Sequence, residues 1–311
     1  MPRTLVRRVA LRHSLTRKHV TDNCFAPRFG ALAYVIGGSM RIRITVASVL
    51  AAGAVSAAIV GGVPVVGQTQ RSAMPRSADG KPDLTGVWQA MNTANWDLQA
   101  HAARRGPVIA LGAAFSVPGG PGVVDGDEIP YLAAAAAKKK ENADHWLARD
   151  PEIKCYLPGV PRMMYMPYPV QIVQGRDTIM MASEFASASR TVRMNSKDKS
   201  PTDTWMGWSI GRWEGDTLVV DVTDQTDQTW FDRAGNFHSD ALKVVERFSV
   251  VDRNTISYEA TLEDPKVFSR PWKISMPLYR HAEKNARLME YKCVEFAEEL
   301  MYGHLRKQPS N

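Results

Sequence analysis

Residues 211–223, GRWEGDTLVVDVT, read as two alternating strands folded about a tight reversal, and this motif constrains the fold more than any other part of the chain. Gly215 stands at the reversal, where a residue without a side chain accepts the backbone dihedrals that a hairpin turn needs. A second hairpin follows, with strands over 243–251 and 255–263 joined through the Asp-Arg-Asn sequence of 252–254. Two successive hairpins of this kind predict an antiparallel β fold.

Short alternating or apolar segments bounded by turn residues continue this pattern along the chain. Strands are therefore expected at 83–88, 170–173, 178–185, 190–194, 209–213, 217–223, 243–251, 255–263, 272–278 and 287–294. Nine or ten strands with short reversals favour an up-and-down barrel, because closure removes exposed sheet edges. Residues 128–146, which include five consecutive alanines before a lysine run, predict one peripheral helix. The predicted fold is mainly β, an antiparallel up-and-down barrel with that helix outside it.

The formal net charge of +7 comes from the N-terminal part of the chain. Residues 1–67 hold nine of the 39 basic residues but only one acidic residue, Asp22. Residues 68–311 carry the other 30 basic and 31 acidic side chains, which gives them a net charge of −1. Since these residues have no excess of positive charge, the sequence argues against a nucleic-acid partner.

Residues 40–67 have the order of a secretory signal peptide. Met40-Arg-Ile-Arg supplies a cationic start, residues 45–66 carry no charge, and Gly67 precedes a polar switch. The alternative is an uncleaved membrane anchor, because about 22 apolar residues can span a bilayer. Cleavage predicts a periplasmic or secreted protein. Only an uncleaved signal would attach the protein to the membrane. The expected divisions are a doubtful extension whose start codon was placed too early (1–39), the signal (40–67), a linker (68–82), the barrel domain (83–303) and a tail (304–311).

Cys155 and Cys293 are the only cysteines after the signal. In an oxidising compartment they are expected to form a disulfide that ties the start of the β region to its last strand. The alternative is a pair of buried free thiols.

Several motifs between residues 83 and 303 carry a resemblance to known proteins. Gly86-Val87-Trp88, at the opening of a β meander, resembles the start of lipocalin-like (calycin) barrels. A broader set resembles a widespread family of secreted bacterial proteins of unassigned function: CYLPGVPR (155–162), PYP (167–169), WEGDTLVVD (213–221), HSDAL (238–242), ERF (246–248) and EDP (263–265). The resemblance implies export and a β domain, and it implies no particular reaction.

A polar segment after the first hairpin contains the candidates for acid–base chemistry, which are His238, Asp221, Asp240 and Glu246. His238 can move a proton if a nearby carboxylate orients its ring. Glu246 alternates with apolar residues of its strand, so an inward face would require its carboxylate to pair with a residue such as Arg190 or to stay protonated. The alternative is an exposed polar loop in which His238 bonds to the backbone.

Two other motifs for chemistry are weaker. Residues 207–211 match G-x-S-x-G, but a strand follows Ser209 where a nucleophilic serine needs a helix, so an ordinary strand serine is expected. No HxxxH, HExxH or CxxC spacing occurs after residue 67, and no metal site is predicted. A mononuclear site built from His238 and distant carboxylates stays open as an alternative.

The candidate ligand-binding residues are two cations and three aromatic side chains, Arg190, Arg247, Trp213, Trp230 and Tyr165. The first hypothesis is an exported binding protein that holds a small, largely apolar or aromatic molecule inside the barrel. The alternative is a cofactor-independent lyase, isomerase or hydrolase that uses His238 with nearby carboxylates. A third is an envelope interaction protein with a filled barrel and a large exposed apolar patch. No cofactor is expected in any of these cases.

Overall fold

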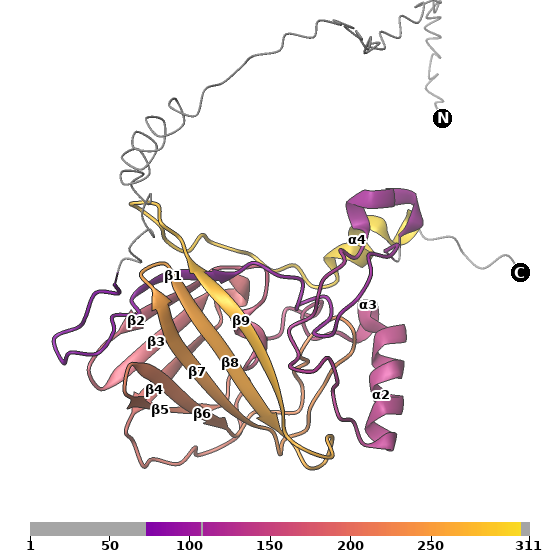
Figure 1. Ribbon diagram of the computed structural model, residues 1–311. Helices are drawn as coiled ribbons and strands as arrows, with labels where there is room; N and C mark the ends of the chain where they lie inside the picture. Colours follow the sequence, from indigo (N-terminus) through magenta and orange to yellow (C-terminus); the bar gives the residue numbers. More distant parts are fainter. Residues whose placement is uncertain (1–72, 107, 306–311) are drawn as a thin grey trace, which may run out of the picture. The chain divides into compact units, whose positions relative to one another are not determined.

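A computed structural model describes residues 73–106 and 108–305 of the 311-residue chain. Within these residues, nine strands form one closed barrel (Figure 1). The barrel closes by antiparallel pairing of its first and last strands, for example between Trp88 and Arg280. The strands are β1 (Gly86–Ala90), β2 (Val170–Gln174), β3 (Thr178–Ser183), β4 (Ser189–Met194), β5 (Trp208–Glu214), β6 (Thr217–Thr223), β7 (Lys243–Asp252), β8 (Thr255–Glu263) and β9 (Trp272–Arg280). The predicted mainly β barrel is confirmed.

One neighbouring pair, β4 with β5, is parallel, whereas the other eight pairs are antiparallel. The parallel pairing is short and joins residues 192–194 of β4 to residues 209–211 of β5. Gly211 allows this approach, because a Cβ added there would lie 2.6 Å from the Val192 Cγ1 atom. Parallel neighbours cannot be joined by a tight turn, so residues 195–207 carry the chain back along the barrel. The strand direction, which was predicted to alternate around the whole barrel, therefore does not reverse between β4 and β5.

Packed side chains fill the middle of the barrel, because alternate residues of each strand point inward. On β8, the inward residues Ile256, Tyr258, Ala260 and Leu262 have no exposed surface. The same holds for Ile172, Met181, Val192, Val220, Phe248 and Ile274 on other strands. Side chains without accessible surface do not border a water-sized cavity, so the interior resembles an ordinary close-packed core.

The predicted peripheral helix lies outside the barrel (Figure 1) and is shorter than expected. It is α2 (Ala133–Asp144), followed by a single turn, α3 (Trp146–Arg149). Tyr131 pairs with Phe268 instead, which keeps the residues before α2 extended. The other helices are α4 (Ala297–Tyr302), η3 (Ile109–Phe115), η4 (Arg162–Met164), η5 (Phe185–Ser187) and η6 (Gly303–Leu305).

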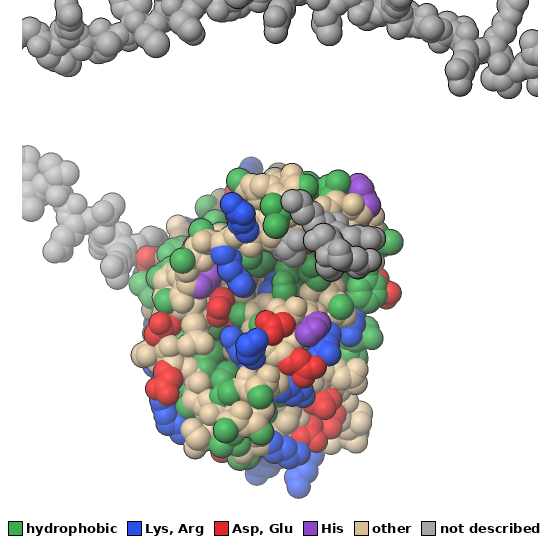
Figure 2. Space-filling model, turned by 90° about the vertical axis from the view of Figure 1, so that its right-hand side faces the viewer, with side chains coloured by type: hydrophobic (Ala, Val, Ile, Leu, Met, Phe, Trp, Pro, Cys, Tyr) green, Lys and Arg blue, Asp and Glu red, His purple; other side chains and the backbone are tan. Residues whose placement is uncertain are grey.

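The surface over α2, α3 and α4 mixes acidic, basic and apolar side chains, and no single charge sign dominates this face (Figure 2). Among residues 73–106 and 108–305, no helix is both long and apolar enough to cross a bilayer.

The predicted extension and signal at 1–67 lie outside the described residues. Residues 73–82 of the predicted linker are described, and Arg76 there forms an ion pair with Asp216 at 2.6 Å.

The predicted strand at 287–294 is wrong. β1 and β9 pair with each other, so the closed barrel leaves no edge for a further strand. These residues run instead along the outside, where the Tyr291 ring packs against Tyr168 and Phe185.

The predicted disulfide between Cys155 and Cys293 is confirmed. Its Cα atoms are 5.7 Å apart, and it joins positions 138 residues apart in the sequence. Both cysteines lie in segments without regular secondary structure, so the bridge fastens the C-terminal segment to the chain that precedes β2.

Candidate functional site

His238 lies in the segment of residues 224–242, which joins β6 to β7, and its imidazole is buried. Its Nε2 atom is 2.6 Å from the Thr229 hydroxyl, and its Nδ1 atom is 2.8 Å from the Ser239 carbonyl oxygen. A carbonyl can only accept, so Nδ1 donates to it and Nε2 accepts from Thr229. Burial lowers the pKa of His238 and keeps the ring neutral. Both ring nitrogens are therefore used within the loop.

The three carboxylates predicted to act with His238 lie elsewhere. Asp221 forms an ion pair with Arg212 on the outer face of the barrel, and Asp240 forms an exposed pair with Lys266 at 2.6 Å. Glu246 points into the barrel and is fully buried. Among the described residues, none of the three makes a hydrogen bond to His238.

Glu246 meets Arg190 inside the barrel. The Arg190 Nη1 and Nη2 atoms donate to the two Glu246 carboxylate oxygens at 2.6 and 2.9 Å, and the Tyr258 hydroxyl donates to Oε1 at 2.8 Å. Burial alone would lower the pKa of Arg190, but the charge of Glu246, its hydrogen bonds and the nearby Tyr258 together raise the pKa. Burial and the Glu246 charge also raise the pKa of Tyr258, so its hydroxyl stays a donor. This is a bidentate buried ion pair.

The other candidate ligand-binding residues are dispersed. Tyr165 is buried and donates to the Phe231 carbonyl oxygen at 2.9 Å. Trp230 belongs to the core, and Trp213 packs against it. Arg247 forms an ion pair with Glu214 on the outer face, with an N–O distance of 2.9 Å. None of these four residues lines either of the two pockets described below, one of which Arg190 lines.

A buried aromatic cluster closes the end of the barrel where β9 begins. The Phe231 ring centre is 5.1 Å from that of His238 and 5.8 Å from that of Trp272. Phe268 packs against Trp272 in turn, at 5.3 Å. The His238 ring therefore packs against this aromatic cluster through Phe231.

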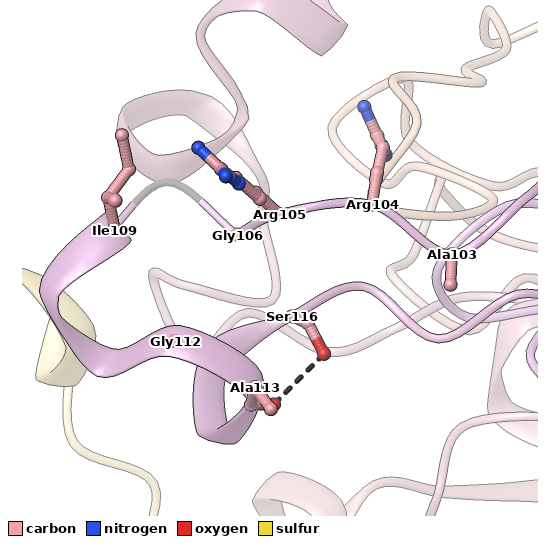
Figure 3. Close-up of a pocket in the computed structure, with 8 residues that line it drawn as sticks. All are labelled: Ala103, Arg104, Arg105, Gly106, Ile109, Gly112, Ala113 and Ser116. Carbon is pink, nitrogen blue, oxygen red and sulfur yellow. Dashed lines mark hydrogen bonds between the residues drawn. The ribbon is translucent and has the colours of Figure 1, made fainter.

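A pocket of about 490 Å³ lies in the loop that includes η3. In Figure 3, the Arg104 and Arg105 side chains extend away from the facing part of the loop, which carries Gly112 in η3 and Ser116 after it. The Ser116 hydroxyl is used within the loop, where it donates to the Ala113 carbonyl oxygen at 2.9 Å. Because the polar groups do not converge, this hollow has little to recognise a ligand with.

A second pocket, of about 370 Å³, lies beside the short parallel pairing of β4 and β5. The strands contribute Ser189, Arg190, Thr191, Arg193 and Trp208, and the neighbouring segments contribute Leu157, Thr204, Trp205, Met206 and Gly207. Apolar and aromatic walls with a few polar groups are the usual composition of a small-molecule site. This pocket also reaches Arg190, the residue that anchors Glu246 in the barrel.

Residues 204–207, which line the pocket, are held by a left-handed turn at Gly207 and by a backbone bridge. Thr204 pairs with Gln225, and the Thr204 amide donates to the Asp224 carbonyl oxygen at 2.9 Å. Gly207 has a φ of +66°, and a Cβ there would lie 2.8 Å from the Thr223 carbonyl oxygen. Only glycine suits both conditions, so Gly207 fixes the direction in which the chain enters β5.

The segment that follows Cys155 of the disulfide also lines the pocket. Two residues after Cys155, Leu157 lines the pocket, and the ring of Tyr156 lies 4.8 Å from that of Trp205. Gln225 holds this segment in place through two hydrogen bonds to the Val160 backbone, at 2.7 and 2.9 Å. The pocket is therefore assembled from segments far apart in the sequence.

A buried charged network supports the same segment. The Arg162 guanidinium pairs with Asp150 at 2.9 Å and with Glu152 at 2.7 Å, and Arg233 pairs with Glu152 at 2.6 Å. Burial alone would raise the pKa of Glu152, but Arg233 and Arg162 lower it to about 2. Two buried carboxylates face two guanidinium groups, and Glu298 lies 3.9 Å from Arg233 at the edge of this network, which fixes the chain before β2.

Sequence reasoning missed Arg193, Trp205 and Trp208 as site residues. The closely spaced aromatics of Trp205-Met206-Gly207-Trp208, directly before a predicted strand, were the available signal. Ser209 lies within β5 and is buried, which confirms its expected role as a strand residue. No cluster of His, Cys, Asp and Glu suited to a metal ion occurs in the described part of the chain.

No protein-family model matches the chain, and no curated protein matches it either. The fold and the pocket together define a closed nine-stranded β-barrel with a side pocket beside its two parallel strands. The resemblances to lipocalin-like barrels and to a secreted bacterial family stay predictions from the sequence.

Proposed function

We propose that this chain is an exported barrel protein that binds a small, largely apolar or aromatic molecule in the pocket beside β4 and β5. The observation that carries the proposal is the lining of this pocket, where Trp205, Met206 and Leu157 stand beside polar strand residues. Its volume of about 370 Å³ is within the range of small-molecule sites.

The position of this site differs from the one expected from the sequence. A ligand inside the barrel would need space that the inward side chains occupy, since Phe248, Tyr258 and Ile274 have no exposed surface. The side pocket needs no such rearrangement. The Cys155–Cys293 bridge supports export, because disulfides persist mainly in oxidising compartments.

Titration of the purified full chain with N-phenyl-1-naphthylamine tests this proposal. This uncharged dye gains fluorescence in apolar sites, and we expect saturable binding with one dye per chain. Trp205→Ala should weaken binding about tenfold or more, because it removes a large aromatic wall. Tyr279→Ala is the matched control, since this exposed aromatic residue lies on β9 and does not line the pocket.

Ser189→Tyr gives a second test that leaves the core intact. Ser189 is exposed on β4 and lines the pocket, so the larger side chain should obstruct the dye without disturbing the fold. The proposal fails if the dye does not bind, or if both pocket variants bind it as tightly as the Tyr279→Ala control.

A further inference from the structure

The charges that line the β4–β5 pocket have one sign. Arg190 and Arg193 are its charged residues, and neither Asp nor Glu contributes to its lining. The nearby segment 195–207 carries Lys197 and Lys199 against Asp198 and Asp203, so it adds no net charge, and none of these four lines the pocket. A molecule in this pocket therefore meets guanidinium groups without a competing carboxylate in the wall.

The two arginines differ in the partners of their N–H groups and in how their charge is balanced. Glu246 takes the Nη1 and Nη2 donors of Arg190 and balances its charge. The Arg190 Nε atom is buried and has no hydrogen-bond partner among the described residues. Arg190 thus adds little net charge to the pocket, and its buried Nε atom is not exposed to a molecule bound there.

Arg193 offers the charge. Its guanidinium carbon lies 3.6 Å from the centre of the Trp208 ring, which is itself fixed by a bond from its Nε1 to the Asp198 carbonyl oxygen at 3.1 Å. Among residues 73–106 and 108–305, no carboxylate lies within ion-pair distance of Arg193. Stacking on an aromatic ring holds the guanidinium plane in place and leaves its N–H edge available for an oxyanion.

We propose that the ligand of this pocket is an amphipathic anion, with an aromatic body against Trp205 and Met206 and a carboxylate or sulfonate head bound by Arg193. The inference rests on the proposed function, since it specifies the class of molecule that the same pocket holds. The hydroxyl groups of Thr191 and Thr204 supply further polar contacts along the lining.

Two dyes with one ring system separate this inference from the proposed function. 8-Anilino-1-naphthalenesulfonate carries an anionic head that N-phenyl-1-naphthylamine lacks, and both are titrated against the full chain. We expect the sulfonate dye to bind about tenfold more tightly, the effect of one charge-assisted contact. Arg193→Gln should abolish this preference and leave the affinity for the uncharged dye unchanged.

Arg247→Gln is the matched control, because Arg247 is also a partly exposed arginine on the outer face of the barrel but does not line the pocket. Arg193→Lys keeps the charge but loses the planar fork, so it should restore part of the preference. Equal affinity of the wild-type chain for both dyes overturns the inference and leaves the proposed function standing. An equal loss of both dyes in Arg193→Gln also overturns it, because that result assigns Arg193 a structural role. Failure of both dyes to bind the wild-type chain rejects the proposed function itself.

Discussion

Removal of Arg190 should destabilise the barrel by an amount that depends on pH. In Arg190→Met, the fully buried Glu246 carboxylate keeps only the Tyr258 hydroxyl as a partner. Breaking a buried ion pair at one side costs about 3–5 kcal/mol. A carboxyl in that position responds by raising its pKa, and each pKa unit corresponds to about 1.4 kcal/mol.

The sign of the pH dependence follows from this raised pKa. The folded variant binds a proton more tightly than the unfolded chain, whose Glu pKa is about 4.3. Stability is therefore lost as pH rises from about 4.3 to the new, higher pKa. We expect a cost of about 1 kcal/mol at pH 5 and the full 3–5 kcal/mol at pH 8.

The complementary variant, Glu246→Gln, removes the negative charge of the pair. It leaves the Arg190 guanidinium buried without its counter-charge, and a guanidinium cannot escape by losing its proton. The cost of Glu246→Gln should therefore be nearly the same at pH 5 and pH 8. Arg190→Met combined with Glu246→Leu removes both charges and should cost less at pH 8 than either single change.

Urea denaturation followed by far-UV circular dichroism at pH 5 and pH 8 measures these free energies of unfolding. The wild-type chain at each pH is the reference, which removes the contributions of all other titrating groups. Equal destabilisation of Arg190→Met at both pH values would refute the argument, because it would mean that Glu246 is not the group left unpaired. A double variant less stable than Glu246→Gln would refute it as well.

Three further predictions concern the segments around the barrel. Replacing Cys155 and Cys293 by serine opens a cross-link over 138 residues and should lower the urea-derived stability by about 3–5 kcal/mol; a loss below about 1 kcal/mol would contradict this. Glu152→Gln should destabilise the fold above pH 4.5, and its difference from wild type should shrink as pH falls toward 2, because the folded pKa of Glu152 is about 2; a constant difference in acid unfolding curves would count against it. His238→Gln should flatten the pH dependence of the melting temperature below about pH 6.5, since the lowered pKa of His238 makes wild-type stability fall there as pH decreases; identical slopes would show that His238 does not contribute.

The strands were predictable because their signals are local. The turn at Gly215 and the alternation along 217–223 and 243–251 depend on neighbouring residues, and the structure has strands at those places. The segment 287–294 has similar local character, but closure of β1 onto β9 leaves it without a partner. Pairing is a property of the whole sheet, which local pattern does not contain.

The candidate site was less predictable for the same reason. The inward side chain of Glu246 followed from strand periodicity, and Arg190 is the partner that this position required. His238 and Asp240 are close in sequence, yet the loop turns the ring toward Thr229 and leaves Asp240 exposed beside Lys266. The pocket depends on the parallel approach of two strands, which no single segment encodes.

The number of strands explains why that parallel pair exists. Each antiparallel neighbour reverses the strand direction, and one full circuit of a closed ring must restore it, so the antiparallel neighbours in a barrel are even in number. A ring of nine strands has nine neighbouring pairs, and it must therefore contain an odd number of parallel ones; this barrel has the minimum, β4 with β5. A barrel of eight or ten strands can be built from antiparallel neighbours alone. The pocket beside β4 and β5 thus occupies the one seam that an odd strand count imposes on the barrel wall.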